Sequence, residues 1–95
     1  MPTLVFRSER GEDQEYLVNQ STTTIGRAAD LDVFLDHTSV SRRHARIGRA
    51  GDQYEIRDLR STNGTFVDGK RVRQAILIEG SRILIGEVPL RFSFK

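Results

Sequence analysis

Apolar and polar residues alternate along much of this chain. In the segment 88–94, valine, leucine and two phenylalanines share one face, and arginine and serine share the other. Segments 45–47 and 54–57 alternate in the same way. A period of two places successive side chains on opposite faces of a strand, so these segments are predicted to be half-buried strands. Two short apolar runs, 76–78 and 83–85, are predicted to be buried strands. No segment repeats apolar residues at helical spacing for long enough to predict a helix.

Turn-forming residues interrupt this pattern at short intervals. Asp68 and Gly69 stand between the apolar segments 65–67 and 71–72. A two-residue type I′ turn needs positive φ at both central positions, so this dipeptide predicts a hairpin. Further turn signals occur at 10–13, 50–52, 63–64, 79–80 and 85–86. Many short strands joined by regular turns are typical of a β-sandwich or a β-barrel.

Length and composition limit the possibilities further. The 95 residues leave room for one domain, expected over 1–95. Without cysteine the chain forms neither a disulfide nor a thiolate metal site, and its two histidines have no metal-ligand spacing. We therefore predict no metal and no cofactor. No apolar run approaches the roughly 20 residues that span a bilayer, and the N-terminus lacks the shape of a signal peptide. We expect a cytoplasmic protein that does not engage a membrane.

Positive charge is concentrated in two places. The formal net charge is only +2, but four arginines fall within 42–49, and three basic residues fall within 70–73. Such local positive potential indicates an anionic partner.

Three segments resemble neither strands nor simple turns: 24–30, 36–44 and 58–65. Together they offer arginine guanidinium groups, several hydroxyls, a carboxamide and backbone N–H groups beside glycine. Arginine presents a planar charged fork that matches phosphate oxygens, and hydroxyls and N–H groups fill the remaining acceptor positions. The three segments therefore predict a site for a phosphate dianion.

The order and spacing of these motifs closely resemble the forkhead-associated (FHA) domain. The resemblance rests on segments 25–27, 40–45, 58–69 and 79–86, and it extends from about residue 24 to residue 92. Asp68 replaces a commoner asparagine and Ser81 a common aspartate, and both replacements keep turn chemistry. The resemblance implies an all-β, two-sheet sandwich of about eleven short strands, of the SMAD/FHA type, with ligand loops at one end. It also implies a non-catalytic module that binds phosphothreonine in a partner protein or in its own parent chain, downstream of a Ser/Thr kinase. The chain could be a fragment of a larger signalling protein.

The resemblance also assigns roles position by position. The positions matched to phosphate contacts are Arg27, Ser41, Arg42 and Thr62. Asn63 is matched to a contact with the peptide backbone, and Ser39 and Arg60 to the loop that selects the residues around the phosphothreonine. Structural support of the site is implied for Gly26, His44 and Gly64; His44 would tie the binding loop together, and Gly26 would let the chain turn beneath it.

The same residues also bear on two other classes of function, an enzyme and a nucleic-acid-binding domain. Ser41 and His44 stand three apart, but the chain has no Gly-x-Ser-x-Gly nucleophile motif, so we predict no enzyme. A basic β-barrel that binds single-stranded nucleic acid is the main alternative, and it would need aromatics on a basic face. Only Tyr16, Phe34 and Phe66 are candidates, because the other aromatics that we placed fall at core-like positions; the sequence therefore favours a phosphopeptide. A purely structural or oligomerising β-module would leave the polar loops unexplained.

Overall fold

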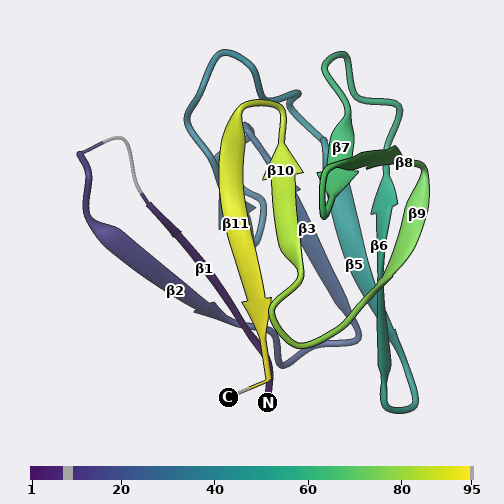
Figure 1. Cartoon of the computed structure of the whole chain (residues 1–95). Coiled ribbons are helices and arrows are strands. Elements are labelled where there is room, and N and C mark those ends of the chain that lie inside the picture. The colour runs from purple at the N-terminus through teal and green to yellow at the C-terminus, as the bar shows by residue number, and fades with distance from the viewer. Residues whose placement is uncertain (8–9, 95) are drawn as a thin grey trace.

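A computed structural model describes residues 1–7 and 10–94. The described part of the chain contains strands and no helix (Figure 1). The strands are β1 (Thr3–Arg7), β2 (Asp13–Leu17), β3 (Thr22–Gly26), β4 (Val33–Phe34), β5 (Ala45–Ala50), β6 (Gln53–Asp58), β7 (Thr65–Val67), β8 (Lys70–Val72), β9 (Gln74–Leu77), β10 (Arg82–Ile85) and β11 (Val88–Ser93). Within the same residues, no helix is long and apolar enough to cross a membrane.

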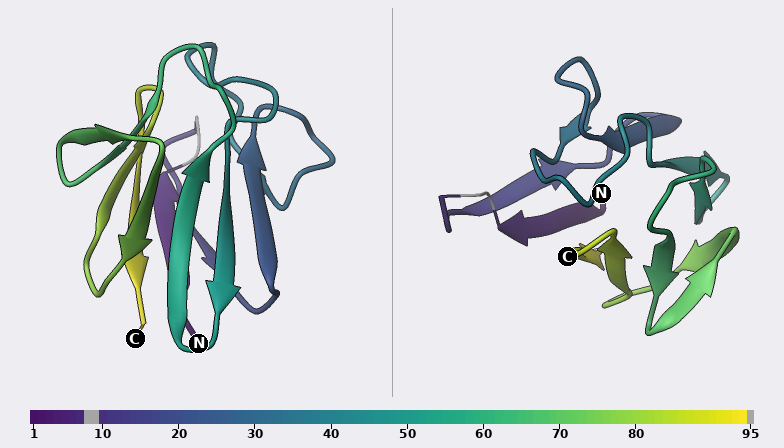
Figure 2. Two further views of the ribbon diagram at one scale, coloured as in Figure 1. Left: turned by 90° about the vertical axis from the view of Figure 1, so that its right-hand side faces the viewer. Right: turned by 90° about the horizontal axis from the view of Figure 1, so that it is seen from above.

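The strands form two sheets that pack face to face. The six-stranded sheet has the order β2-β1-β11-β10-β7-β8, and the five-stranded sheet has the order β4-β3-β5-β6-β9. Every pairing is antiparallel except that of β3 with the two-residue strand β4. The prediction of a two-sheet sandwich of about eleven strands is therefore confirmed. Both chain ends lie at one end of the sandwich, and the loops that follow β3, β4 and β6 lie at the other (Figures 1 and 2).

The alternating segments place their apolar residues between the sheets. In β5, Ala45 and Ile47 are buried and Arg46 is exposed, and in β6 Ile56 is buried while Arg57 is exposed. Burial of such side chains is the main force that holds two sheets together.

An aromatic cluster lies at one end of the core. The Phe92 ring is fully buried, 5.6 Å from that of Tyr54 between ring centroids. Phe94 meets the Tyr54 ring edge-on at 5.8 Å, yet its side chain is 41% exposed, so its predicted core position is only partly correct. Phe94 lies just beyond the end of β11, where the sheets no longer cover it.

The apolar run 76–78 is not the buried strand that its composition predicts. Ile76 is 48% exposed and Ile78 is 62% exposed, and only Leu77 faces the core. The reason is that Ile76 lies on the outer face of the sheet, in register with Glu55, so the strand keeps the alternation of a half-buried strand. Ile78 lies beyond the end of β9.

The predicted hairpin at Asp68 and Gly69 is confirmed. Their φ angles are 49° and 87°, and the turn joins β7 directly to β8. Positive φ at both positions is what the type I′ turn requires.

Candidate functional site

Three loops meet at the end of the sandwich opposite the termini. The first loop (27–32) joins β3 to β4, the second (35–44) joins β4 to β5, and the third (59–64) joins β6 to β7. Ser41 connects all three, since its carbonyl accepts a hydrogen bond from the Arg27 N–H at 3.0 Å and its Oγ accepts one from the Thr62 N–H at 3.1 Å. The structure therefore brings Arg27, Ser41 and Thr62 together, as the sequence predicts.

The Arg27 side chain is anchored at one nitrogen only. Its Nε donates to the carbonyl of Val40 at 2.9 Å, and the side chain is otherwise exposed. Within the described residues its two terminal nitrogens have no hydrogen-bond partner. Those nitrogens carry four of the five N–H donors of a guanidinium group, so an oriented fork is left for an anion.

The Ser41 hydroxyl is held in a way that favours donation. Because Oγ accepts from the Thr62 N–H, one of its lone pairs is already used and its hydroxyl hydrogen is left to point elsewhere. The Ser41 side chain is half-buried, and Thr62 is exposed beside it. An anion seated between the loops would meet this hydroxyl as a donor.

His44 connects the base of the site through four hydrogen bonds. Its fully buried ring accepts the Ser41 N–H at Nδ1 (3.0 Å) and faces the Gly64 carbonyl with Nε2 (2.8 Å). Since Nδ1 accepts, Nε2 carries the hydrogen and donates to Gly64. Its backbone N–H donates to Ile25 at 2.9 Å and its carbonyl accepts from Leu59 at 2.9 Å.

Two glycines allow the loops to approach each other. A side chain on Gly26 would clash with the backbone carbonyl of Arg42, which the loop cannot easily move. Gly26 does not have a positive φ, so its role is this close packing rather than the release of a turn that we expected. Gly64 has a φ of 94°, in the left-handed region that favours glycine, as a tight-turn glycine requires.

Asp58 holds the third loop in shape, and sequence reasoning missed it. Its carboxylate accepts hydrogen bonds from the Ser61 hydroxyl, the Ser61 N–H (3.2 Å) and the Thr65 hydroxyl (2.7 Å), while Ser61 Oγ accepts the Gly64 N–H at 3.0 Å. Burial alone would raise the pKa of Asp58, but these hydrogen bonds and the nearby His44 outweigh it and lower that pKa below its ordinary value. An aspartate three residues before a serine in a turn-rich segment is the signal that could have revealed this role.

Ser39 differs from the role that the resemblance implies. It is buried, its Oγ accepts the Glu87 N–H at 2.9 Å, and the same oxygen contacts His37 Nδ1 at 2.8 Å. Its carbonyl accepts from Asn63 Nδ2 at 2.8 Å. Ser39 thus fastens the second loop to the β10–β11 turn, and its side chain has no exposed group to read a peptide.

The other predicted contact residues are exposed around the same loops. Asn63 donates one hydrogen bond from Nδ2 to the Ser39 carbonyl, which leaves Oδ1 free to accept a peptide N–H. Arg42 and Arg60 are exposed, and their side chains have no hydrogen bond or ion pair within residues 1–7 and 10–94. Arg60 has a φ of 58°, which is uncommon for a residue with a side chain.

The geometry argues against an enzyme and against a nucleic-acid-binding domain. Both ring nitrogens of His44 are occupied by backbone groups, so His44 does not accept the Ser41 hydroxyl proton as a general base would. Tyr16 and Phe34 line one hollow, but its described lining has five carboxylates and only two arginines, so its charge would repel a nucleic-acid backbone. Phe66 lies on β7, outside that lining. In the described part of the chain, no three His, Asp or Glu side chains gather where they could hold a metal ion.

Comparison with known proteins agrees with this arrangement. The family model for the FHA domain matches residues 23–86. The chain is 43% identical over 89 residues to the oxoglutarate dehydrogenase inhibitor of Corynebacterium jeikeium, covering 94% of this chain and 62% of that protein. It is 38% identical to the glycogen accumulation regulator GarA of Mycolicibacterium smegmatis, covering 94% of this chain and 56% of that protein. The chain therefore spans a little over half the length of these relatives.

Solved structures show the same fold. The FhaA FHA domain, solved in complex with the intracellular domain of Rv3910, superimposes with a TM-score of 0.87 at 33% identity, covering 97% of this chain and 99% of that one. EmbR of Mycobacterium tuberculosis, solved with a low-affinity phosphopeptide, superimposes with a TM-score of 0.85 at 35% identity, covering 98% of this chain and 24% of that one.

Proposed function

The chain belongs to the FHA domain family, and on this basis we propose that it binds phosphothreonine on a partner protein and catalyses no reaction. In this proposal Arg27, Ser41, Arg42 and Thr62 hold the phosphate and Asn63 holds the peptide backbone. Arg60 contributes to the choice of the surrounding sequence. The partner is phosphorylated by a Ser/Thr kinase, and the interaction takes place in the cytoplasm.

One observation carries the proposal: the hydrogen bonds of Ser41 hold donors from three loops around one point. Arg27 donates its backbone N–H to the Ser41 carbonyl, and Thr62 donates its own to the Ser41 hydroxyl. The guanidinium of Arg27 is anchored by Nε alone, so its remaining donors are oriented before a ligand arrives. A site organised in advance loses less conformational entropy on binding.

The number of donors suits a phosphate dianion. Phosphothreonine carries close to two negative charges near neutral pH, with three strong acceptor oxygens. Each hydrogen bond to a charged group contributes about 1.5–3 kcal/mol. Four such bonds contribute at most about 12 kcal/mol. Association costs at least about 4 kcal/mol, which leaves up to about −8 kcal/mol, the value for micromolar affinity. A glutamate in place of phosphothreonine offers one charge and two coplanar oxygens, so it should bind much more weakly.

The names of the relatives suggest a regulatory role. One is an inhibitor of oxoglutarate dehydrogenase, and another is a regulator of glycogen accumulation. We propose that residues 1–95 act as the phosphate-reading part of a regulator of this kind, so that binding depends on the state of an upstream kinase.

Calorimetry with a phosphothreonine peptide chosen from a peptide array tests the proposal. We expect micromolar binding that disappears when the threonine is unphosphorylated and falls at least tenfold in Arg27→Ala. Arg82→Ala is the matched control, since Arg82 is exposed on β10, outside the loops. Equal affinity for the phosphorylated and unphosphorylated peptides, or unchanged affinity in Arg27→Ala, would contradict the proposal.

A further inference from the structure

The outer face of the five-stranded sheet carries two rows of side chains that cross four strands. The first row, nearer the loops, runs from Thr24 on β3 through Arg46 and Arg57 to Gln74 on β9. The second row runs parallel to it and consists of Thr22, Gly48, Glu55 and Ile76. Gly48 interrupts the second row, because it has no side chain to stand between Thr22 and Glu55.

Nothing in the fold requires glycine at position 48. Its φ is not positive, and a Cβ at this position would meet no atom within 4 Å. Glycine inside a strand costs about 0.5–1 kcal/mol relative to alanine. Where neither a bulge nor a bend explains it, a glycine within a strand often marks a place where a ligand or another backbone approaches closely.

A hollow of about 480 Å³, which we call the Gly48 hollow, lies over the place where this side chain is missing. Its lining includes Thr22, Arg46, Gly48, Glu55, Arg57 and Ile76. Two outward arginines, Arg46 and Arg57, outnumber the single Glu55, so the hollow carries a net positive charge. Arg49 belongs to the other face of β5, where its guanidinium lies 5.9 Å from the ring centroid of Tyr54. Ile76, at 48% exposure, adds an apolar side chain.

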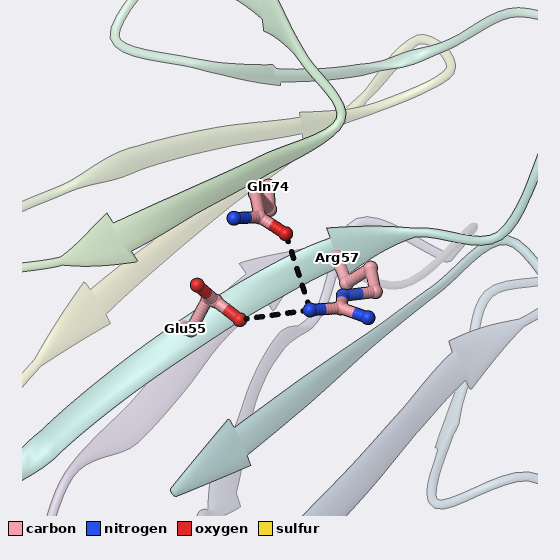
Figure 3. A network of polar contacts seen from close by, with 3 residues as sticks. All are labelled: Glu55, Arg57 and Gln74. Carbon is pink, nitrogen blue, oxygen red and sulfur yellow. Dashed lines mark hydrogen bonds and ion pairs between the residues drawn. The ribbon is translucent and has the colours of Figure 1, made fainter. Parts of the chain in front are cut away.

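Two of these arginines stand directly opposite each other. Arg46 on β5 pairs with Arg57 on β6, and like charges in this relation destabilise a sheet. Arg57 Nη2 donates to Glu55 Oε1 at 3.5 Å and to Gln74 Oε1 at 3.1 Å (Figure 3). Arg46 is exposed, and its side chain has no hydrogen bond or ion pair with any described residue. An exposed pair such as Glu55–Arg57 contributes little to stability, so the net positive charge remains available to a partner.

The opposite sheet provides an internal comparison. Arg82 on β10 faces Arg91 on β11, and Arg91 faces Val5 on β1. This row has the same paired arginines but no glycine among these three residues. Val5, at 37% exposure, also gives this row an exposed aliphatic side chain. Paired arginines and an exposed aliphatic residue therefore do not distinguish the Gly48 hollow; the missing side chain of Gly48 does.

We propose that the Gly48 hollow is a second docking surface, which takes an acidic segment with an aliphatic side chain from the same partner whose phosphothreonine enters the loops. Carboxylates of the segment would approach Arg46 and Arg57, and the aliphatic side chain would pack on Ile76. This proposal rests on the proposed function. Strand β5 leads straight from the site to the hollow, because Gly48 follows His44 by four residues, or about 13 Å.

Three kinds of fluorescent peptide test the proposal by anisotropy. The first is a short phosphothreonine peptide, and the second adds a six-residue Gly/Ser linker and the tail Asp-Glu-Leu-Asp-Glu, attached in turn at either end. Such a linker spans roughly 13 Å on average, which matches the separation of the two surfaces. The third peptide replaces the acidic residues of the tail with their amides. We expect the acidic tail attached at one of the two ends to strengthen binding about fivefold or more at low salt and the amide tail to have little effect.

Variants locate the effect. Gly48→Val places a branched side chain in the hollow at a position where a Cβ meets nothing, and Arg46→Glu reverses the charge of one of its arginines. Both should abolish the gain and leave the short peptide unaffected, while Arg82→Glu should keep the gain. If the short peptide binds but neither tailed form binds more tightly, or if the gain survives Gly48→Val and Arg46→Glu, the inference is wrong and the proposed function stands.

A second measurement does not depend on the phosphothreonine site. The free tail peptide, without phosphothreonine, is titrated into the ¹⁵N-labelled chain. We expect the amide signals of Gly48 and Ile76 to shift on titration of the parent protein and not of Arg46→Glu. If they do not shift in the parent protein, or shift equally in Arg46→Glu, the inference is wrong. If the short phosphopeptide fails to bind while these shifts occur, the proposed function fails and the hollow remains as an acidic-segment site.

Discussion

Replacing His44 with alanine should destabilise the fold more than any exposed substitution in the loops. The ring is fully buried, and its two nitrogens join Ser41 in the second loop to Gly64 at the end of the third. Removing it deletes both hydrogen bonds and leaves a cavity beneath the site. The Ser41 N–H and the Gly64 carbonyl lose their partners, and Gly64 is buried.

The expected loss can be worked out from these contacts. Two hydrogen bonds contribute about 1 kcal/mol each, and a buried group left without a partner adds about 1–3 kcal/mol. The expected loss is about 3–5 kcal/mol of the free energy of unfolding. A domain of this size has roughly 5–14 kcal/mol in all, so the variant should be close to its limit of stability. Since 1 kcal/mol shifts the melting temperature by about 4–8 °C in such domains, we expect a fall of about 12 °C or more.

Urea denaturation and thermal melting measure this loss. Arg43→Ala is the matched control, because Arg43 is exposed in the same loop as His44 and its side chain makes no hydrogen bond or ion pair with any described residue. We expect that control to change the free energy of unfolding by no more than about 0.5 kcal/mol. A His44→Ala variant that melts like the parent protein but fails to bind a phosphothreonine peptide would refute this reasoning and assign His44 to the ligand.

Further variants probe the other contacts that shape the site. Gly26→Ala should cost about 1–3 kcal/mol in urea denaturation, because its Cβ would meet the Arg42 carbonyl, whereas Gly48→Ala should be neutral or stabilising; equal effects would refute the role of close packing. The lowered pKa of Asp58 means that its ionised form stabilises the fold above its unfolded pKa near 4, and that this contribution is lost as pH falls through the folded pKa. Asp58→Asn should therefore show a shallower fall of melting temperature below about pH 4 than the parent protein, and an unchanged acid limb would count against it. A peptide with glutamate in place of phosphothreonine should bind at least tenfold more weakly by calorimetry, and equal binding would show that the double charge is not read.

Much of the site could be predicted once the order of the motifs was recognised. Arg27, Ser41 and Thr62 lie far apart in the sequence, and only the resemblance placed them together; the structure brings them within one cluster of loops. The roles of Ser39 and Asp58 could not be predicted in this way. Ser39 is held by Glu87, which is 48 residues away, and no local pattern reports such a contact.

The sequence by itself determined the strands and turns, because those depend on short-range chemistry. Alternation in 54–57 and the dipeptide at 68–69 specify a half-buried strand and a type I′ turn wherever they occur. The tertiary structure alone decided that Ile76 and Ile78 are exposed, since their burial depends on which face of the sheet is covered and on where β9 ends. It also decided that Gly26 must be glycine and that Gly48 lies beneath a hollow. The two glycines are chemically identical, and they differ only in what the rest of the chain places beside them.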